Sequence, residues 1–363
     1  MKILHYSAAE LLKFSEVDVM SNFSNGDILD DKVIAIKGMP FYEKGTKITT
    51  KEINYIINAI HKYEVVIILD PEHIYMHGWI DLIKVLHDLD KLIIFQTFST
   101  GIKHFLDRKI PNNKIIVNTV ENLLYWFFQN NNGVVHNFDI SKKRKFLLKH
   151  FSYNRNPQRD YITDFLLKNN LVENNNISFH NHPDNKARLR EKNIAYACVE
   201  SENILKNVDM EKLETLKIIP DTENFNIENQ NLQINKILEA NTNSYFEILS
   251  EAQTPMSDDP ENCYYYTYST TARTLNPILY GNVFHIMPDS KLYETELKKI
   301  GFQLFFENND DFINSLSEEF YFDRITQFKL LNNFEVLRSI NSKNIKRPFY
   351  IEKLEQIYSI KFK

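Results

Sequence analysis

The chain has few of the features that mark disulfide scaffolds, cysteine metal sites or membrane spans. Only two cysteines occur, Cys198 and Cys263, and they have neither CxxC spacing nor a larger set of partners. We therefore expect a reduced, cytoplasmic protein without a zinc site built on cysteine. No run approaches the roughly 20 apolar residues that a bilayer-spanning helix needs. The N-terminal segment MKILHYSAAELLKF also lacks the basic start, long apolar middle and cleavage site of a signal peptide.

An excess of positive charge is lacking too. The formal net charge is −5 at pH 7, which argues against binding of duplex nucleic acid through many phosphates. One local exception exists, because seven lysines and arginines and no acid lie between residues 142 and 159. From Lys142 to Lys149 we expect this basic segment to be a solvated strand edge or loop. Arg155 and Arg159, further along, are candidates for binding an anion.

What the chain does have is enough apolar side chain for large cores. Apolar residues make up 43% of the sequence and aromatic residues 13%, so we expect an ordered protein. A length of 363 residues fits two domains of about 150 residues each. The polar run QNNNGVVHNFD interrupts the pattern before residue 140. We therefore predict one domain at residues 1–140, a second at 141–335 and a C-terminal helical segment at 336–363.

The first half of the chain alternates short apolar runs with helical patterns. The runs that we predict as strands are Met1–His5, Val33–Lys37, Val65–Leu69, Leu92–Gln96 and Ile115–Val117. The predicted helices are Thr50–Tyr63, Trp79–Leu89 and Val120–Gln129. Strands that alternate with helices indicate an α/β fold with a parallel sheet. Ligands of such sheets bind beyond the carboxyl ends of the strands, and Asp70, Glu72 and His73 follow one of these strands.

The second half contains two segments in which a strand is followed by a polar loop and a helix. The first runs from a strand at Phe146–Phe151 through Arg155 to a helix at residues 158–168. The second is a buried strand carrying Glu251, followed by a tyrosine-rich loop and a helix that opens at residues 269–271, with Arg273 in its first turn. A helix N-terminus favours an anion, and arginine can grip a phosphate through two bonds. We interpret both segments as parts of a pyrophosphate site; surface arginines paired with nearby acids are the alternative.

The remaining patterns complete the predicted fold of the second half. A strand at Val283–Met287 follows the second helix, and Lys291–Ile300 is a helix that ends at Gly301. Phe302–Phe306 is predicted as a strand, and residues 312–340 show the pattern of an amphipathic helix. Two groups of residues with ligand-like spacing are predicted not to bind a metal. Asp88-Leu89-Asp90 precedes a strand instead of ending one, and His180 and His182 lack a nearby third ligand.

Four pieces of the second half together resemble a set of bacterial and phage glycosyltransferases related to fucosyltransferase-like enzymes. They cover about residues 141–330 and read YNRNPQRDYITDFLLKNNLVENNNISF, SYFEILSEAQTP, STTARTLNPILYGNVFHIM and KIGFQLF. The resemblance implies a GT-B fold, in which two Rossmann-like, doubly wound domains face each other across a cleft and the C-terminal domain holds the donor nucleotide. It makes residues 1–140 the acceptor-side domain.

The resemblance also assigns roles to individual residues. Arg155 and Arg273 match cations that touch the donor pyrophosphate, Thr271 and Thr274 match threonines that flank the second of them, and Glu251 matches an acid near the donor sugar. The chain departs from the family at three positions. Ala272 stands where the family has a glutamate that binds the ribose, Asn276 replaces a second lysine, and Gln158 replaces an arginine although Arg159 adjoins it. Tyr268 and the tyrosines before it either stack on the donor base or pack their loop against the domain.

These observations lead to an expected function. We expect a metal-independent, inverting glycosyltransferase without a cofactor, which moves a sugar from a nucleotide-sugar donor to a glycan or, in a narrower version, to a hydroxymethylated base of phage DNA. The base that takes the acceptor proton is predicted among Glu72, Asp70 and His73, in that order. An ordinary helix-capping start is the alternative for this Asp-Pro-Glu run. Because Ala272 replaces the ribose acid, a catalytically impaired nucleotide-sugar or ligand-binding protein is the alternative function.

Overall fold

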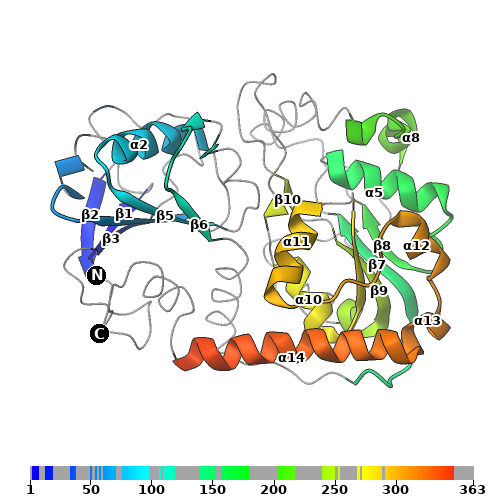
Figure 1. The fold of residues 1–363 in the computed structure, drawn as a ribbon. Coiled ribbons are helices and arrows are strands. Elements are labelled where there is room, and N and C mark those ends of the chain that lie inside the picture. Colours follow the sequence, from blue (N-terminus) through cyan, green and yellow to red (C-terminus); the bar gives the residue numbers. More distant parts are fainter. Residues whose placement is uncertain are drawn as a thin grey trace. The chain divides into compact units, whose positions relative to one another are not determined.

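The computed structural model of the chain divides into two compact units. The described residues are 2–7, 13–18, 33–37, 50, 54, 57–58, 60–70, 76–97, 106–107, 109–118, 139–152, 157–179, 203–216, 239–249, 252–253, 268–269, 272–287 and 291–346. Unit 1 contains Met1–Gly133, Thr254–Thr270 and Ile340–Lys363, and unit 2 contains Val134–Gln253 and Thr271–Ser339. Each unit is described separately below and is drawn in Figure 1.

Unit 1 is built on a six-stranded sheet with the strand order β2-β1-β3-β4-β5-β6. Its strands are β1 (Lys2–Ser7), β2 (Lys13–Asp18), β3 (Val33–Lys37), β4 (Val65–Asp70), β5 (Leu92–Thr97) and β6 (Ile116–Asn118). All neighbours are parallel except β1 and β2, which pair antiparallel. The five strands predicted in this half are confirmed. The edge strand β2 was not predicted, because its sequence KFSEVD has only two apolar residues, Phe14 and Val17, and contains neither an apolar run nor a regular alternation.

The interior of unit 1 explains why the parallel strands can be recognised in the sequence. Val65 and Val66 point to opposite faces of β4 and are both buried, as expected for a strand that is covered on both sides. The helix α2 (Met76–Asp88) contributes Leu82, Ile83 and Leu86, which are fully buried. The predicted helix at residues 79–89 is therefore confirmed, whereas the predicted helix Val120–Gln129 lies outside the described residues.

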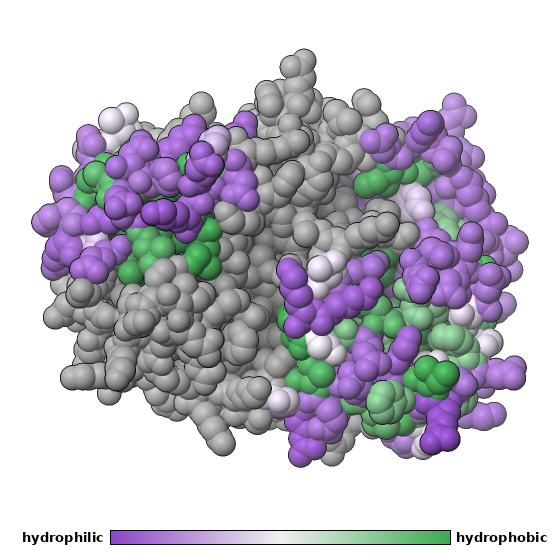
Figure 2. All heavy atoms as spheres, viewed as in Figure 1, coloured by the Kyte–Doolittle hydropathy of each residue, from purple (hydrophilic) through white to green (hydrophobic). Residues whose placement is uncertain are grey.

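Unit 2 is built on a four-stranded sheet in which all neighbours are parallel, with the order β12-β9-β7-β8. Its strands are β7 (Phe146–Ser152), β8 (Asn176–Phe179), β9 (Ser244–Leu249) and β12 (Val283–Ile286). Its helices are α5 (Pro157–Lys168), α8 (Met210–Thr215), α10 (Ala272–Tyr280), α11 (Lys291–Ile300), α12 (Asn309–Asn314), α13 (Glu318–Phe322) and α14 (Arg324–Lys346), of which residues 340–346 belong to unit 1. Of the two short strands that precede α10 in the chain, β10 (Ala252–Gln253) belongs to unit 2 and β11 (Tyr268–Ser269) belongs to unit 1. Hydrophilic side chains cover the outward side of α11 (Figure 2).

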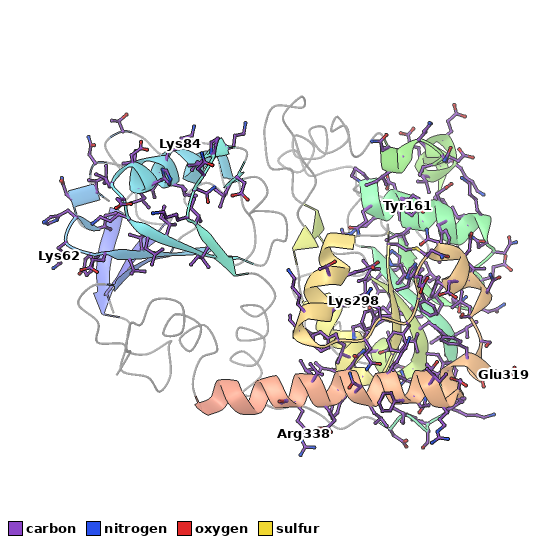
Figure 3. All side chains as sticks on the ribbon, in the orientation of Figure 1. Lys62, Lys84, Tyr161, Lys298, Glu319 and Arg338 are labelled. Carbon is purple, nitrogen blue, oxygen red and sulfur yellow. The ribbon has the colours of Figure 1, made fainter. Side chains whose placement is uncertain are left out.

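An aromatic cluster fills the space between the sheet of unit 2 and the helices that follow it. Phe246 of β9 lies near Phe306, Phe312 and Phe320, with ring centroids 6.2–6.5 Å away. His285 of β12 stacks on Phe312 at 4.9 Å. Its ring nitrogen Nε2 lies 2.9 Å from Oδ1 of Asn309, whose amide donates to the hydroxyl of Tyr161 on α5 (Figure 3). The short helices are thus tied to both the sheet and α5.

The prediction of a strand at Phe302–Phe306 is wrong. The segment is irregular, although Phe302, Phe305 and Phe306 are buried as strand residues would be. The side-chain amide of Asn333 on α14 takes the place of a neighbouring strand, because its Oδ1 accepts from the N–H of Gln303 at 2.7 Å and its Nδ2 donates to the carbonyl at 2.9 Å. A run of apolar residues does not distinguish these two ways of satisfying a buried backbone.

The chain is therefore a mixed α/β protein with parallel sheets. Most of the elements predicted between residues 141 and 300 are confirmed, with α5, α11 and the strands β7 and β12 close to their predicted bounds. The predicted pattern at residues 312–340 corresponds to three helices, α12, α13 and α14, and the predicted boundary after residue 335 falls inside α14. Among the described helices, none has the combination of length and apolar character that is needed to cross a bilayer.

Candidate functional site

The carboxyl edge of the sheet in unit 2 has the topology of a ligand site. From β7 the chain passes through α5 to β8 on one side, whereas from β9 it passes through α10 to β12 on the other side. The adjacent strands β7 and β9 are parallel and form the point where the direction of the connections reverses. In open parallel sheets, connections of opposite direction leave a crevice beyond the carboxyl ends of the two strands. We therefore take this edge as the candidate site.

The first turn of α5 lies at this edge and is packed with buried polar groups. Pro157 occupies the first helical position, where the missing N–H costs no hydrogen bond. Gln158, Arg159 and Asp160 follow it and are all buried. The Gln158 amide donates to the carbonyl of Met287, the residue after β12, and so connects α5 to the carboxyl end of another strand.

The other amide atom of Gln158 is the best marker of a ligand in the described part of the site. Gln158 is fully inaccessible, and its buried Oε1 has no hydrogen-bond partner among the residues that the structure describes. Ser178 of β8 pairs with Phe151 near the end of β7. Its buried hydroxyl also has no hydrogen-bond partner among the described residues. A buried acceptor without a partner costs about 1–3 kcal/mol. A ligand hydroxyl or amine would satisfy such atoms.

The helix α10 begins at the same edge. Arg144, which precedes β7, donates to the carbonyls of Tyr280 and Gly281 at 2.8 and 3.0 Å. The last turn of α10 therefore lies at the amino edge of the sheet. With nine residues and a rise of about 1.5 Å per residue, the helix extends toward the carboxyl edge. The prediction that Arg273 lies in a first helical turn is confirmed, and Thr274 shares that turn.

The other predicted site residues are placed only in part. Asp70 is the last residue of β4 and pairs with Thr97, so it lies at the carboxyl edge of the sheet in unit 1. Tyr268 belongs to β11. The predicted strand with Glu251 ends earlier than expected, because β9 stops at Leu249. The residues outside the described ones are Glu72, His73, Arg155, Glu251 and Thr271.

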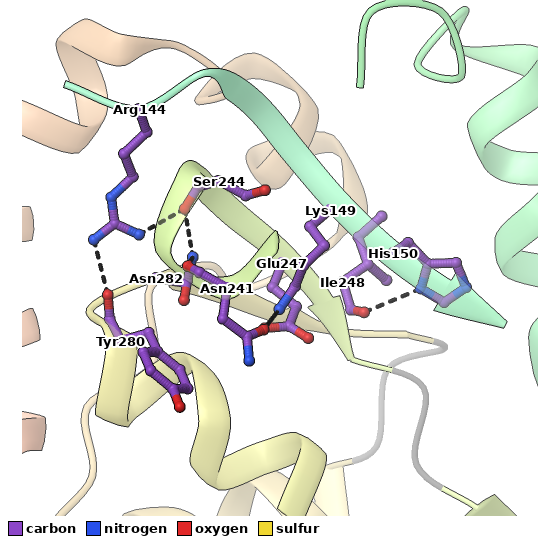
Figure 4. Close-up of polar contacts among 9 residues, drawn as sticks. All are labelled: Arg144, Lys149, His150, Asn241, Ser244, Glu247, Ile248, Tyr280 and Asn282. Atoms are coloured by element: carbon purple, nitrogen blue, oxygen red, sulfur yellow. Dashed lines mark hydrogen bonds and ion pairs between the residues drawn. The ribbon is translucent and has the colours of Figure 1, made fainter. Parts of the chain in front are cut away.

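The prediction of a solvated segment from Lys142 to Lys149 is partly wrong. Lys142, Lys143 and Lys145 are exposed as expected, whereas Arg144 and Lys149 are buried. The Arg144 guanidinium donates to the Ser244 carbonyl at 2.6 Å, besides its bonds to the end of α10 (Figure 4). It also lies 5.1 Å from the ring of Tyr321. Arg144 therefore joins β9, α10 and α13 at the amino edge of the sheet.

Lys149 forms a buried ion pair in the middle of the sheet. Its Nζ lies 2.7 Å from the carboxylate of Glu247, the residue that faces it on β9, and it also donates to the side chain of Asn241 (Figure 4). Burial lowers the pKa of Lys149, and the attraction of Glu247 opposes that shift. Burial also lowers the pKa of Arg144. Arg144 and Lys149 are therefore both engaged in the scaffold of unit 2.

The pairing of Lys149 with Glu247 could not be found from the sequence alone. The two residues belong to strands that are distant in the chain, and only the sheet order makes them neighbours. The only local signal of a buried amine is the position of Lys149 inside the apolar strand β7, between Leu148 and His150. His150 is buried too, and its Nδ1 lies 3.1 Å from the carbonyl of Ile248.

Within the part of the chain that the structure describes, no three His, Cys, Asp or Glu side chains gather closely enough to hold a metal ion. The expectation of a metal-independent reaction stays a prediction. Comparison with protein families, with characterised proteins and with solved structures finds no match to this chain. The resemblance of residues 141–330 to fucosyltransferase-like enzymes therefore also stays a prediction.

Proposed function

We propose that the chain is a glycosyltransferase whose nucleotide-sugar donor binds at the carboxyl edge of β7 and β9. The observation that carries the proposal is the reversal of connections between these two strands, with α5 and α10 both beginning at that edge. Nucleotides bind at such points in open parallel sheets. The sequence resemblance supports the same edge, because its donor residues follow β7, follow β9 and begin α10. In the GT-B architecture, unit 2 would be the donor domain and unit 1 the acceptor domain.

The donor side of the proposed reaction uses residues at that edge. The oxygen of the acceptor hydroxyl attacks the anomeric carbon of the donor sugar, and the bond from this carbon to the phosphate oxygen breaks. The electron pair leaves with the nucleoside diphosphate, or with the monophosphate in the case of a CMP-sugar. Arg155, Arg273 and the N–H groups of the first turns of α5 and α10 would stabilise its negative charge. The hydroxyl proton passes to a carboxylate, for which Glu72 and then Asp70 are the candidates. A single direct displacement inverts the anomeric centre.

A turnover assay tests the proposal. The full chain is incubated with UDP-, GDP-, CMP- and dTDP-sugars, with and without glycan acceptors, and release of the nucleotide is measured. We expect release from one class of donor, and loss of it in Arg273→Ala with no change of the unfolding midpoint. Lys298→Ala removes an exposed cation of α11 in the same unit and is the matched control, which should retain turnover. Absence of both turnover and donor binding would reject the proposal.

One observation favours a second candidate function. The first turn of α10 contains no acidic residue, and Ala272 occupies the position of the ribose-binding glutamate in the resembled family. A protein that binds a nucleotide sugar without transferring it would show donor binding but no release of nucleotide in the same assay. Transfer to a modified DNA base is the narrower version of the main proposal. Gel-shift binding to duplex DNA at moderate salt would favour it over a glycan acceptor.

A further inference from the structure

The first half of α14 presents large apolar side chains to solvent. Ile325, Phe328 and Leu331 have 68%, 63% and 48% of their surface exposed, and Phe322, just before the helix, has 38%. Figure 2 shows apolar side chains at the surface over the first turns of α14. Single exposed apolar residues are common, but several on adjacent turns of one helix indicate an interaction surface.

The opposite side of α14 is fixed to the body of unit 2. Thr326, Leu330, Asn333, Phe334 and Leu337 are all buried. At 3.6 residues per turn these positions share one side of the helix, and the exposed apolar positions lie on the other. The helix cannot rotate to bury the exposed residues without breaking the two hydrogen bonds from the Asn333 side chain. The apolar side is therefore available to a partner outside unit 2.

The exposed side of α14 has a regular arrangement of charges around its apolar centre. Arg324, Phe328, Leu331 and Glu335 follow the spacing i, i+4, i+7, i+11 and are all exposed. In an α-helix these four positions lie within about 60° of one another around the axis, so they form a single stripe along the surface. The stripe begins with a cation and ends with an anion.

Two copies of this stripe are complementary to each other when the two helices run antiparallel. If a second α14 lies antiparallel to the first, Arg324 is level with Glu335 of the other copy, and Phe328 is level with Leu331. The charged contact and the apolar contact each occur twice, as the two-fold axis of a homodimer requires. Glu335 also lies 3.5 Å from Arg338, but both side chains of this pair are about two-thirds exposed, so it contributes little. Arg338 points outward from α14 (Figure 3).

We propose that two copies of this chain associate through the stripe formed by Arg324, Phe328, Leu331 and Glu335, with their α14 helices antiparallel. The apolar pair at the centre supplies the driving force, and the charges at the two ends set the antiparallel orientation. Because one helical stripe is small for a specific interface, the association is concentration-dependent, with a dissociation constant on the order of micromolar to tens of micromolar.

Sedimentation of the full chain over about a hundredfold range of concentration tests the proposal, since mass action makes the dimer fraction rise with concentration. We expect a monomer–dimer equilibrium for the native chain and only monomer for Phe328→Asp. Leu89→Asp is the matched control, because Leu89 is an exposed leucine of unit 1 outside the stripe. It should dimerise like the native chain.

A charge exchange tests the antiparallel orientation. Arg324→Glu places two like anionic ends opposite each other in a homodimer, and Glu335→Arg places two like cationic ends opposite each other. Each variant alone should be monomeric at concentrations where the native chain is dimeric. An equimolar mixture of the two should dimerise, because every charged contact is then between opposite charges. The double variant R324E/E335R should dimerise by itself.

Two results would overturn the proposal. One is a native chain that stays monomeric at every concentration. The other is a dimer that Phe328→Asp leaves intact, which would put the interface elsewhere. Dimerisation of the native chain without recovery in the mixture would reject the antiparallel arrangement. Circular dichroism of each variant shows whether the helix content is retained.

Discussion

Lys149 and Glu247 face each other on neighbouring strands, and almost none of the lysine is accessible to solvent. A charge in this position depends on its partner, because water cannot replace the lost interaction. Removing one partner of a buried ion pair costs about 3–5 kcal/mol, whereas replacing both by apolar residues is often neutral. The pair is therefore a sensitive position in the scaffold of the candidate site.

We expect Lys149→Met to lower the free energy of unfolding by about 3 kcal/mol, because the nearly buried carboxylate of Glu247 loses the cation that balances its charge. The double variant K149M/E247L should recover most of that loss. Urea unfolding measures both values, and Lys143→Met, an exposed lysine of the same segment, is the control with little effect. Equal losses in the single and double variants would show that the pair is not the cause.

Tyr321 gives a prediction at high pH. Burial raises the pKa of its hydroxyl to about 12, although the nearby Arg144 guanidinium opposes that shift. Because the folded pKa lies above the unfolded value of 10.0, the stabilisation is complete below pH 10 and is lost as the pH rises toward about 12. The total loss is on the order of 2–3 kcal/mol.

The variant Tyr321→Phe isolates this effect. At neutral pH we expect it to cost about 1 kcal/mol, because the hydroxyl donates to the Gly281 carbonyl at 2.9 Å. Between pH 10 and 12 the difference from the native chain should shrink or reverse, since phenylalanine has no proton to lose. Denaturant unfolding at several pH values measures the difference. A difference that is constant with pH would contradict the assigned pKa shift.

At the scale of elements, α14 and the segment after α11 depend on each other. Gly301, with φ 107°, ends α11 in the left-handed region that favours glycine. The backbone that follows has no strand beside it within the described residues. The side-chain amide of Asn333 forms hydrogen bonds with the N–H and the carbonyl of Gln303 instead. The irregular segment is therefore held in place by a side chain of α14.

Two adjacent asparagines test this dependence. Asn333→Ala leaves an N–H and a carbonyl of Gln303 without partners and should cost about 2 kcal/mol in the free energy of unfolding. Asn332→Ala removes only one long contact, 3.4 Å from the Gly301 carbonyl, and should change stability by less than about 0.5 kcal/mol. Similar values for the two variants in urea unfolding would contradict the role given to Asn333.

Local sequence patterns predicted the parallel strands well, because β3, β4 and β5 are short apolar runs, and Val65 and Val66 are buried on the two faces of β4. The patterns failed where a buried polar group bonds to a residue that is distant in the sequence. The buried amine of Lys149 pairs with Glu247, and the backbone of the segment Phe302–Phe306 bonds to Asn333. No local pattern reveals either partner. At the candidate site, the first turn of α10 was predicted, but the buried Gln158 was regarded only as a substituted arginine.

At the scale of the whole molecule, the strand order in the sheet of unit 2 defines the position of the candidate site. The strands β7 and β9 are neighbours although a long part of the chain separates them, and this adjacency creates the reversal of connections. The account therefore centres on donor binding at one edge of one sheet. A bound donor stabilises the folded chain by about 2.7 kcal/mol at a hundredfold excess over its dissociation constant.

The most direct measurement is the thermal unfolding midpoint of the native chain and of Arg273→Ala with UDP-, GDP-, CMP- and dTDP-sugars. We predict that one class of donor raises the native midpoint by several degrees, and that Arg273→Ala unfolds at the native temperature without ligand but shows no shift with it. A native chain that none of the four donor classes stabilises, or a full shift retained in Arg273→Ala, would contradict the proposed donor site.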